Sequence, residues 1–191
     1  MWPKMRREGC IHGRFQPFHN EHLEYLVAAM THVDYLWIGI TNPDIELFGT
    51  KSKIDNRQSK LANPLTYYER VKLISSVLQS ENIPCHKYGF MPFPIETPQR
   101  IHQFIPRSVI CYTTIREEWN FKKIDRLKAE GFEVVSLWTN LSVKTISSTK
   151  IRELILREND DWRSMLKESA VKYLLEINIY SRLHSISEVI D

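Results

Sequence analysis

Short runs of consecutive apolar residues alternate along this chain with longer segments in which apolar residues recur every three or four positions. Residues 35–40 form an almost continuous apolar run, which is typical of a strand that is buried on both faces. Residues 66–80 instead carry apolar side chains at helical spacing. The same patterns predict strands at residues 10–12, 35–40, 86–90, 108–112 and 133–137, and helices at residues 20–30, 66–80, 98–104, 117–130 and 164–178.

The alternation of strands and helices predicts an α/β fold, with a parallel sheet and helices on both of its faces. We expect a single domain over residues 1–191, with a core over about residues 9–160 and a helical C-terminal tail over about residues 161–191. In this architecture ligands bind beyond the carboxyl ends of the strands. The residues that follow the first predicted strand are therefore candidates for a binding site.

Between the first predicted strand and the first predicted helix lies the segment GRFQPFHNEH, residues 13–22. Gly13 permits backbone conformations that a side chain would forbid, and Asn20 can cap the helix. The unpaired N–H groups of a helix start favour an anion, and His19 and His22 are close enough to face one phosphate. Two structural histidines are the alternative. A metal site is less favoured because no further Cys/His cluster supplies more ligands.

A second candidate segment is TISSTKIRELI, residues 145–155. Its hydroxyl residues precede apolar positions at helical spacing, which indicates a capped helix start. Such caps are common, so a well-capped helix is one interpretation. The other is a phosphate site in which hydroxyl groups, helix N–H groups and Arg152 act together, since a guanidinium can hold two phosphate oxygens. Together, the two segments favour a nucleoside triphosphate as ligand.

Charge and composition narrow the class of protein. The formal net charge of +3 permits anionic ligands but is too small to indicate binding to nucleic acid. We expect no membrane partner, since no run approaches membrane-spanning length and residues 1–4 lack an apolar signal core. Three dispersed cysteines favour reduced, buried thiols in a cytoplasmic protein. The last residues, 181–191, could form a docking tail or a homo-oligomer contact.

The patterns G-R-F-Q-P-F-H-x-x-H and I-S-S-T-x-I-R resemble the two signatures of the HIGH-motif nucleotidyltransferase superfamily. The closest likeness is to the archaeal-type nicotinamide mononucleotide adenylyltransferases and related cytidylyltransferases. Residues 63–70, NPLTYYER, resemble a helix start of this family, and the segment from Trp162 to Val171 resembles its helical tail. The likeness spans about residues 9–178 and implies a Rossmann-like sheet.

The resemblance also implies a reaction and a set of site residues. A phosphate or phosphonate oxygen of an acceptor attacks the α-phosphorus of a nucleoside triphosphate, and pyrophosphate leaves. Mg²⁺ is expected to be coordinated by the phosphate oxygens, with no metal site built by the protein. The implied catalytic residues are His22, His19 and Arg152, and the implied nucleotide-binding residues are Gly13, Arg14, Phe15, Gln16, Ser147, Ser148 and Thr149.

Two departures from the family pattern concern the base and the acceptor. Glu21 stands where the family commonly has glycine, and residues 113–117 lack the glycine of its serine-glycine-asparagine-like turn. Three functions are compatible with the sequence. We favour transfer from ATP to nicotinamide or nicotinate mononucleotide, a step of NAD biosynthesis. The alternatives are CTP-dependent transfer to a small phosphate or phosphonate, and a non-catalytic dinucleotide-sensing module, against which the intact His19, His22 and Arg152 argue.

One long segment, residues 41–63, holds few apolar residues and does not continue the alternation. A connection of this length in a compact domain is usually functional or disordered. We expect either a solvated loop or a basic lid that closes over the triphosphate.

Overall fold

The computed structural model describes residues 6–44, 59–115, 119–138 and 146–188, and the chain divides into two compact units. Most of the predicted lid, residues 45–58, lies outside the described residues. The single domain expected over residues 1–191 stays a prediction. Unit 1 comprises Met1–Gly13, Leu23–Thr41 and Pro84–Lys144, and unit 2 comprises Arg14–His22, Asn42–Ile83 and Thr145–Asp191.

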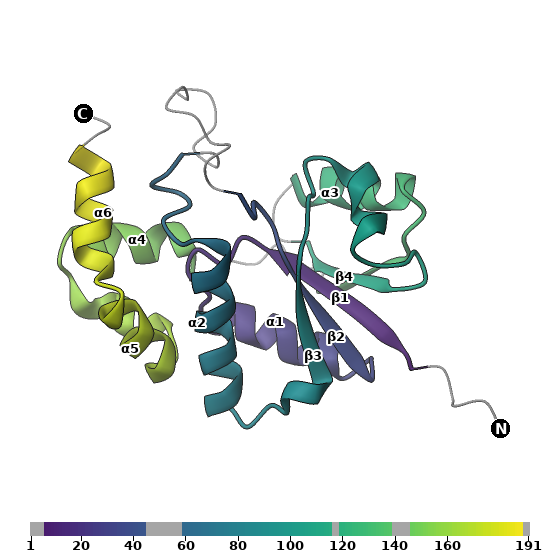
Figure 1. The fold of residues 1–191 in the computed structure, drawn as a ribbon, viewed down its shortest axis with the longest axis horizontal. Coiled ribbons are helices and arrows are strands. Elements are labelled where there is room, and N and C mark those ends of the chain that lie inside the picture. Colours follow the sequence, from purple (N-terminus) through teal and green to yellow (C-terminus); the bar gives the residue numbers. More distant parts are fainter. Residues whose placement is uncertain (1–5, 45–58, 116–118, 139–145, 189–191) are drawn as a thin grey trace. The chain divides into compact units, whose positions relative to one another are not determined.

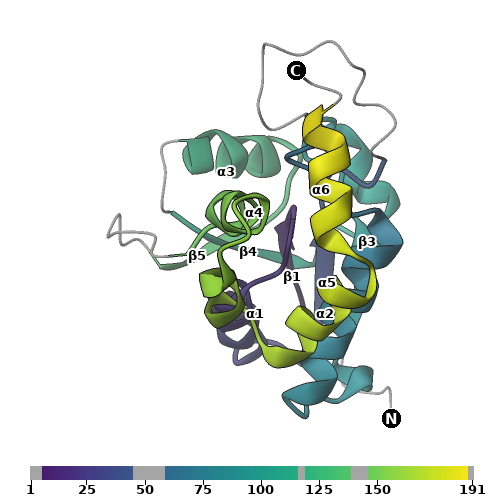
Figure 2. The same ribbon diagram turned by 90° about the vertical axis from the view of Figure 1, so that its left-hand side faces the viewer.

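Unit 1 is built on a parallel five-stranded sheet with the strand order β3-β2-β1-β4-β5 (Figures 1 and 2). Figure 2 shows helices α1 and α3 on opposite sides of this sheet. The predicted α/β class, with a parallel sheet and helices on both faces, is therefore confirmed. The strands are β1 (Glu8–Gly13), β2 (Tyr35–Ile40), β3 (Tyr88–Pro92), β4 (Ile110–Thr114) and β5 (Val134–Trp138), and the helices are α1 (Asn20–Met30), α3 (Trp119–Ala129) and the 3₁₀ helices η1 (Cys85–Lys87) and η2 (Pro98–Gln103).

Two strands begin two residues later than their apolar pattern predicts. The 3₁₀ helix η1 occupies the residues before β3, and its Lys87 N–H donates to the Pro84 carbonyl at 3.0 Å. Before β4, the Val109 N–H donates to the Pro106 carbonyl at 3.1 Å. In both cases a tight turn takes up the first two residues of the predicted strand. The helix predicted at residues 98–104 is also a 3₁₀ helix, η2.

A hydrophobic cluster fixes α3 against one face of the sheet. Cys10 of β1 and Cys111 of β4 pack there with Leu127 of α3, and all three are fully buried. The Tyr25 hydroxyl of α1 donates to the Tyr112 carbonyl of β4.

Cys85 is exposed, so the expectation that all three cysteines are buried is wrong for this one. Among the described helices, none has the length and apolar character that crossing a membrane would require.

Unit 2 is helical. Helix α5 packs on α2, and α4 packs on η3 and α6. The helix predicted at residues 164–178 is shorter in the structure, because its first two residues end η3, and Leu166 and Lys167 are extended before α5 begins. Helix α5 ends before Asn178, which adopts a left-handed conformation (φ 53°) between α5 and α6. Asparagine tolerates this conformation better than most residues. The helices are α2 (Tyr67–Ser80), α4 (Ser148–Leu156), the 3₁₀ helix η3 (Asp160–Met165), α5 (Glu168–Glu176) and α6 (Ile179–Glu188).

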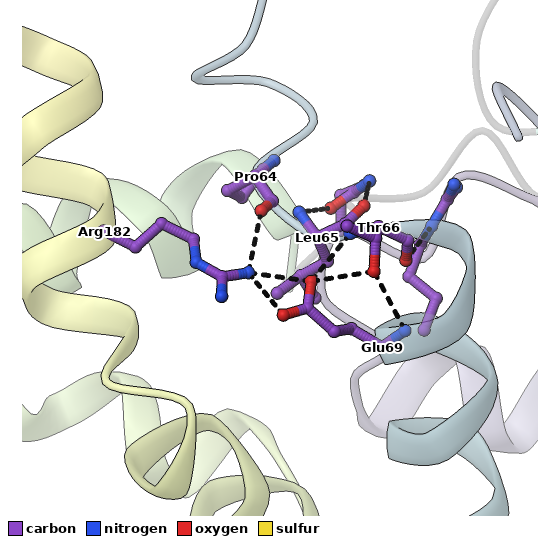
Figure 3. A network of polar contacts seen from close by, with 7 residues as sticks. Pro64, Leu65, Thr66, Glu69 and Arg182 are labelled. Atoms are coloured by element: carbon purple, nitrogen blue, oxygen red, sulfur yellow. Dashed lines mark hydrogen bonds and ion pairs between the residues drawn. The ribbon is translucent and has the colours of Figure 1, made fainter. Parts of the chain in front are cut away.

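A polar network joins α6 to the first turn of α2 (Figure 3). Thr66 and Glu69 form a reciprocal capping box at the start of α2. Nη1 of Arg182 lies 2.7 Å from both carboxylate oxygens of Glu69 and donates to the Pro64 carbonyl at 3.3 Å. Burial raises the pKa of Glu69, but the hydrogen bonds from Arg182 and Thr66 outweigh it and lower the pKa overall.

We expect Arg182→Met to reduce the free energy of unfolding by about 1–2 kcal/mol at neutral pH, since it removes charge-assisted hydrogen bonds from a partly buried carboxylate. The folded-state pKa of Glu69 lies below its unfolded value, so this contribution is lost as the pH falls through the folded pKa. Urea unfolding at several pH values measures it. Lys167→Met, which breaks the more exposed pair with Glu81, should cost less. Equal losses would contradict the assignment.

Candidate active site

The loop that follows β1 is held by aromatic side chains from within it. Phe15 and Phe18 are each 1% exposed, and their ring centroids lie 5.5 Å apart. Both rings also contact the imidazole of His22, at centroid distances of 5.0 and 5.6 Å. Because the two phenylalanines are fixed in the core of unit 2, they also fix the plane of the His22 ring.

The two motif histidines stack on each other. The ring centroids of His19 and His22 lie 3.6 Å apart, and the backbone N–H of His19 donates to Nδ1 of His22 at 3.3 Å. With Nδ1 as an acceptor, a neutral His22 carries its proton on Nε2. The imidazole is therefore set up to donate a hydrogen bond from Nε2.

Asn20 does not cap α1 as predicted. It is the first residue of the helix, its side-chain Nδ2 donates to the Ser164 carbonyl at 3.3 Å, and Oδ1 has no hydrogen-bond partner in the described part of the chain. The turn closes through the backbone instead, where the His22 N–H donates to the His19 carbonyl at 2.9 Å.

Gln16 ties this loop to the residues before α2. Its side chain is 1% exposed and forms two hydrogen bonds with Leu65, donating to the carbonyl at 2.8 Å and accepting from the N–H at 2.9 Å. Both ends of the amide are thus engaged by the protein. The side chain positions the loop, which leaves only the backbone of Gln16 for the phosphate contact that the sequence suggests.

The second motif segment forms the start of α4. Ser147 is the N-cap, and its hydroxyl accepts a hydrogen bond from the Lys150 N–H at 3.1 Å. The Ser148 hydroxyl donates to the Pro17 carbonyl at 3.0 Å. The Thr149 hydroxyl accepts from Nη2 of Arg152 at 3.3 Å. The predicted capped helix start is confirmed, and each of the three hydroxyl groups has a protein partner.

The two motif segments, residues 14–22 and 146–152, are joined by further contacts within unit 2. Glu21 Oε1 accepts from the Ile146 N–H at 2.9 Å, and Nη1 of Arg152 donates to the Gln16 carbonyl at 2.6 Å. Glu21 is the residue that replaces the glycine usual in the family. Its carboxylate therefore serves here as a link between the two motifs.

Three arginines gather around these segments, and we call Arg14, Arg70 and Arg152 the arginine cluster. The pKa of Arg152 is lowered to about 10, mainly by burial and in part by the nearby charge of Arg14, while Glu153 opposes the shift. The pKa of Arg70 is also lowered to about 10, mainly by burial, with Tyr67 opposing the shift and Arg14 adding to it. Like charges held together in this way form an environment that favours a polyanion.

Arg70 is the site residue that the sequence did not predict. It is fully buried, and its guanidinium donates to the carbonyls of Thr66, Arg14 and Asn42 at 3.2, 3.0 and 2.7 Å. Carbonyl oxygens accept these hydrogen bonds but carry no formal charge, so the positive charge of the guanidinium is not neutralised. A signal was present in the sequence, since Arg70 ends the family-like segment NPLTYYER, but its contacts connect residues distant along the chain.

The structure thus brings nine of the ten predicted site residues together in unit 2, and Gly13 lies at the end of β1 in unit 1. Among the described residues, no group of three His, Cys, Asp or Glu side chains is placed to hold a metal ion. The nine are Arg14, Phe15, Gln16, His19, His22, Ser147, Ser148, Thr149 and Arg152.

Comparison with known proteins agrees with this geometry. The cytidylyltransferase-like family model matches residues 10–154. The chain is 30% identical over 177 residues to the phosphonoformate cytidylyltransferase of Streptomyces viridochromogenes, covering 93% of this chain and 95% of that protein. It is 29% identical over 186 residues to the nicotinamide-nucleotide adenylyltransferase of Picrophilus torridus, covering 93% and 96%.

Solved structures share the fold at low sequence identity. A protein from Vibrio parahaemolyticus described as a putative nicotinate-nucleotide adenylyltransferase superposes with a TM-score of 0.56 at 17% identity, covering 90% of this chain and 99% of that one. A bifunctional NMN adenylyltransferase/ADP ribose pyrophosphatase from Francisella tularensis gives 0.64 at 17% identity. That match covers 93% of this chain, which spans about half (52%) of the bifunctional enzyme.

The parallel sheet and the paired motifs define a nucleotidyltransferase of the HIGH-motif superfamily, as the sequence suggested. The chain belongs to the cytidylyltransferase-like family.

Proposed function

We propose that this enzyme transfers a nucleoside monophosphate from ATP to nicotinamide or nicotinate mononucleotide and releases pyrophosphate. The observation that carries this proposal is the joining of the two motifs around the arginine cluster, with Arg152 bonded to Gln16 and His22 stacked on His19. Adenylyl transfer is supported by relatives named nicotinamide-nucleotide adenylyltransferase, at 26% identity in Thermococcus sibiricus and 29% in Picrophilus torridus.

In the proposed reaction, an oxygen of the acceptor phosphate forms a bond to the α-phosphorus, and the bond between that phosphorus and the bridging oxygen to the β-phosphate breaks. The acceptor phosphate is already ionised at neutral pH, so no general base is needed. The protein aligns the reactants and stabilises negative charge as it develops. His22 donates from Nε2 to the α-phosphate, while the arginine cluster and the start of α4 hold the β- and γ-phosphates.

We propose that Mg²⁺ arrives with the triphosphate, where it neutralises charge on the phosphate oxygens. Arginine and the first turn of a helix donate hydrogen bonds and do not ligate metal, so the residues of this site fit an ion held by the phosphates. The cytoplasmic location and a homo-oligomeric state stay predictions from the sequence.

A second function is favoured by a specific observation. The relative at 30% identity is a phosphonoformate cytidylyltransferase, and it matches this chain over almost the whole length of both proteins. This chain also has Glu21 where glycine is usual in the family. The Glu21 carboxylate accepts a hydrogen bond from the Ile146 N–H at the start of the second motif. Cytidylyl transfer from CTP to a small phosphonate is therefore the alternative.

A matrix of pyrophosphate-release assays distinguishes these functions. ATP and CTP are each combined with nicotinamide mononucleotide, nicotinate mononucleotide and phosphonoformate, in the presence of Mg²⁺. We expect release only when triphosphate and acceptor are both present, with ATP and a mononucleotide as the productive pair. If CTP with phosphonoformate is the only pair that is turned over, the second function is established. Absence of release from every pair would overturn nucleotidyl transfer to these acceptors.

A further inference from the structure

Two buried polar side chains at the carboxyl end of the sheet in unit 1 have no hydrogen-bond partner among the described residues. His12 of β1 is 4% exposed, and neither Nδ1 nor Nε2 is bonded. Thr113 of β4 is fully buried, and its Oγ1 is not bonded. Buried polar groups in proteins are almost always hydrogen-bonded, so two such side chains together are suited to binding a polar group of a ligand.

Both side chains lie on the face of the sheet that α3 covers. Strands β1 and β4 are parallel with Cys10 beside Cys111, and these two thiols pack against Leu127 of α3. Side chains two residues further along a strand point to the same face. His12 and Thr113 therefore follow Cys10 and Cys111 on that face, at its carboxyl end.

Helix α3 adds a positive charge at this position. Lys123 lies one turn before Leu127, and the side chain is only 9% exposed. Burial lowers the pKa of His12 well below its usual value, and the charge of Lys123 lowers it further. His12 is therefore neutral at pH 7, and its ring is held by stacking on Phe93 with centroids 4.4 Å apart.

We propose that His12, Thr113 and Lys123 form a subsite for a carboxylate of the acceptor. The proposal rests on the proposed function and specifies the acceptor. The two carboxylate oxygens accept hydrogen bonds from the imidazole N–H and the threonine hydroxyl, and the ammonium group supplies the opposite charge. An uncharged carboxamide in the same place loses the attraction to the ammonium group, and only its one oxygen can accept hydrogen bonds. The subsite therefore selects nicotinate over nicotinamide mononucleotide.

A matched pair of acceptors that differ in the carboxylate tests this proposal: nicotinate and nicotinamide mononucleotide, each with ATP. We expect kcat/KM to be at least about tenfold higher for nicotinate mononucleotide. Thr113→Val and Lys123→Met should bring this ratio toward one. Lys122→Met, an exposed neighbour on α3, should leave the ratio as in the unmodified enzyme.

Calorimetric binding of nicotinate and nicotinamide mononucleotide to the full chain, without triphosphate, separates this proposal from the proposed function. Tighter binding of the acid by about tenfold, lost in Thr113→Val, supports the subsite even if no pair is turned over. Equal binding and equal kcat/KM would overturn it, as would a preference that persists in both variants. A crystal structure with nicotinate mononucleotide that shows only ordered water on His12 and Thr113 would overturn it as well.

Discussion

Replacing His22 with alanine is expected to lower kcat by about 100-fold or more while the affinity for the triphosphate changes by only a few-fold. A donor that acts on charge developing at the α-phosphate stabilises the transition state far more than the bound substrate. The expectation draws on the geometry of the ring, because Nδ1 accepts from the His19 N–H and the proton of the neutral imidazole is on Nε2. Steady-state kinetics with the productive pair and calorimetry with a non-hydrolysable triphosphate measure the two quantities.

His22 also packs against Phe15 and Phe18, so the alanine variant must be shown to be folded. Circular dichroism and the thermal midpoint provide that check. His102→Ala, which removes an exposed histidine from η2 in unit 1, serves as the matched control and should keep kcat unchanged. A folded His22→Ala enzyme with near-normal kcat would show that the histidine pair is structural.

The strands and helices of unit 1 could be predicted because each has an apolar pattern of its own. Strand β2 was predicted with its observed bounds, since its apolar run ends abruptly at polar residues on both sides. The starts of β3 and β4 could not be, because the turns before them contain residues that also suit a strand. The start of α5 could not be predicted either, because the extended residues Leu166 and Lys167 lie inside the apolar periodicity of residues 164–178.

The candidate site was predictable in its residue types and not in its contacts. The phosphate contact expected of the Gln16 backbone N–H stays a prediction, but the bond from its side chain to Leu65, 49 residues away along the chain, was not foreseen. Arg70 was seen only as part of a family-like helix start, while its guanidinium joins the carbonyls of Arg14 and Asn42. Such pairings depend on how distant segments meet. No local pattern of charge or hydrophobicity specifies them.

His12 shows the opposite case. Its place in a predicted strand was a local signal for a buried histidine, but His12 was not among the predicted site residues. A histidine within a short strand of apolar residues has to lie against the core, as the 4% exposure of His12 confirms. What the sequence could not provide was the neighbourhood: Thr113 on the adjacent strand and Lys123 on the covering helix. The chemistry of a buried polar group depends on those neighbours more than on the residue itself.

Arg152→Lys is expected to weaken binding of the triphosphate by about tenfold or more, equivalent to about 1.4 kcal/mol, although the charge is kept. The guanidinium has five N–H donors, and the hydrogen bonds to the Gln16 carbonyl and the Thr149 hydroxyl use two of them. The others can hold phosphate oxygens in a fixed plane. An ammonium group has three donors at one point, so it cannot keep both motif segments joined and hold two phosphate oxygens.

Calorimetry with a non-hydrolysable triphosphate measures this change, with Arg157→Met as a control that removes an exposed charge from the other end of the same helix. The control should change the affinity by less than about threefold, because exposed charges are screened by solvent and salt. The thermal midpoint of Arg152→Lys reports separately on the lost contact to Gln16. A lower midpoint with unchanged affinity would mean that Arg152 only joins the two motifs, and that Arg14 and the start of α4 hold the phosphates without it.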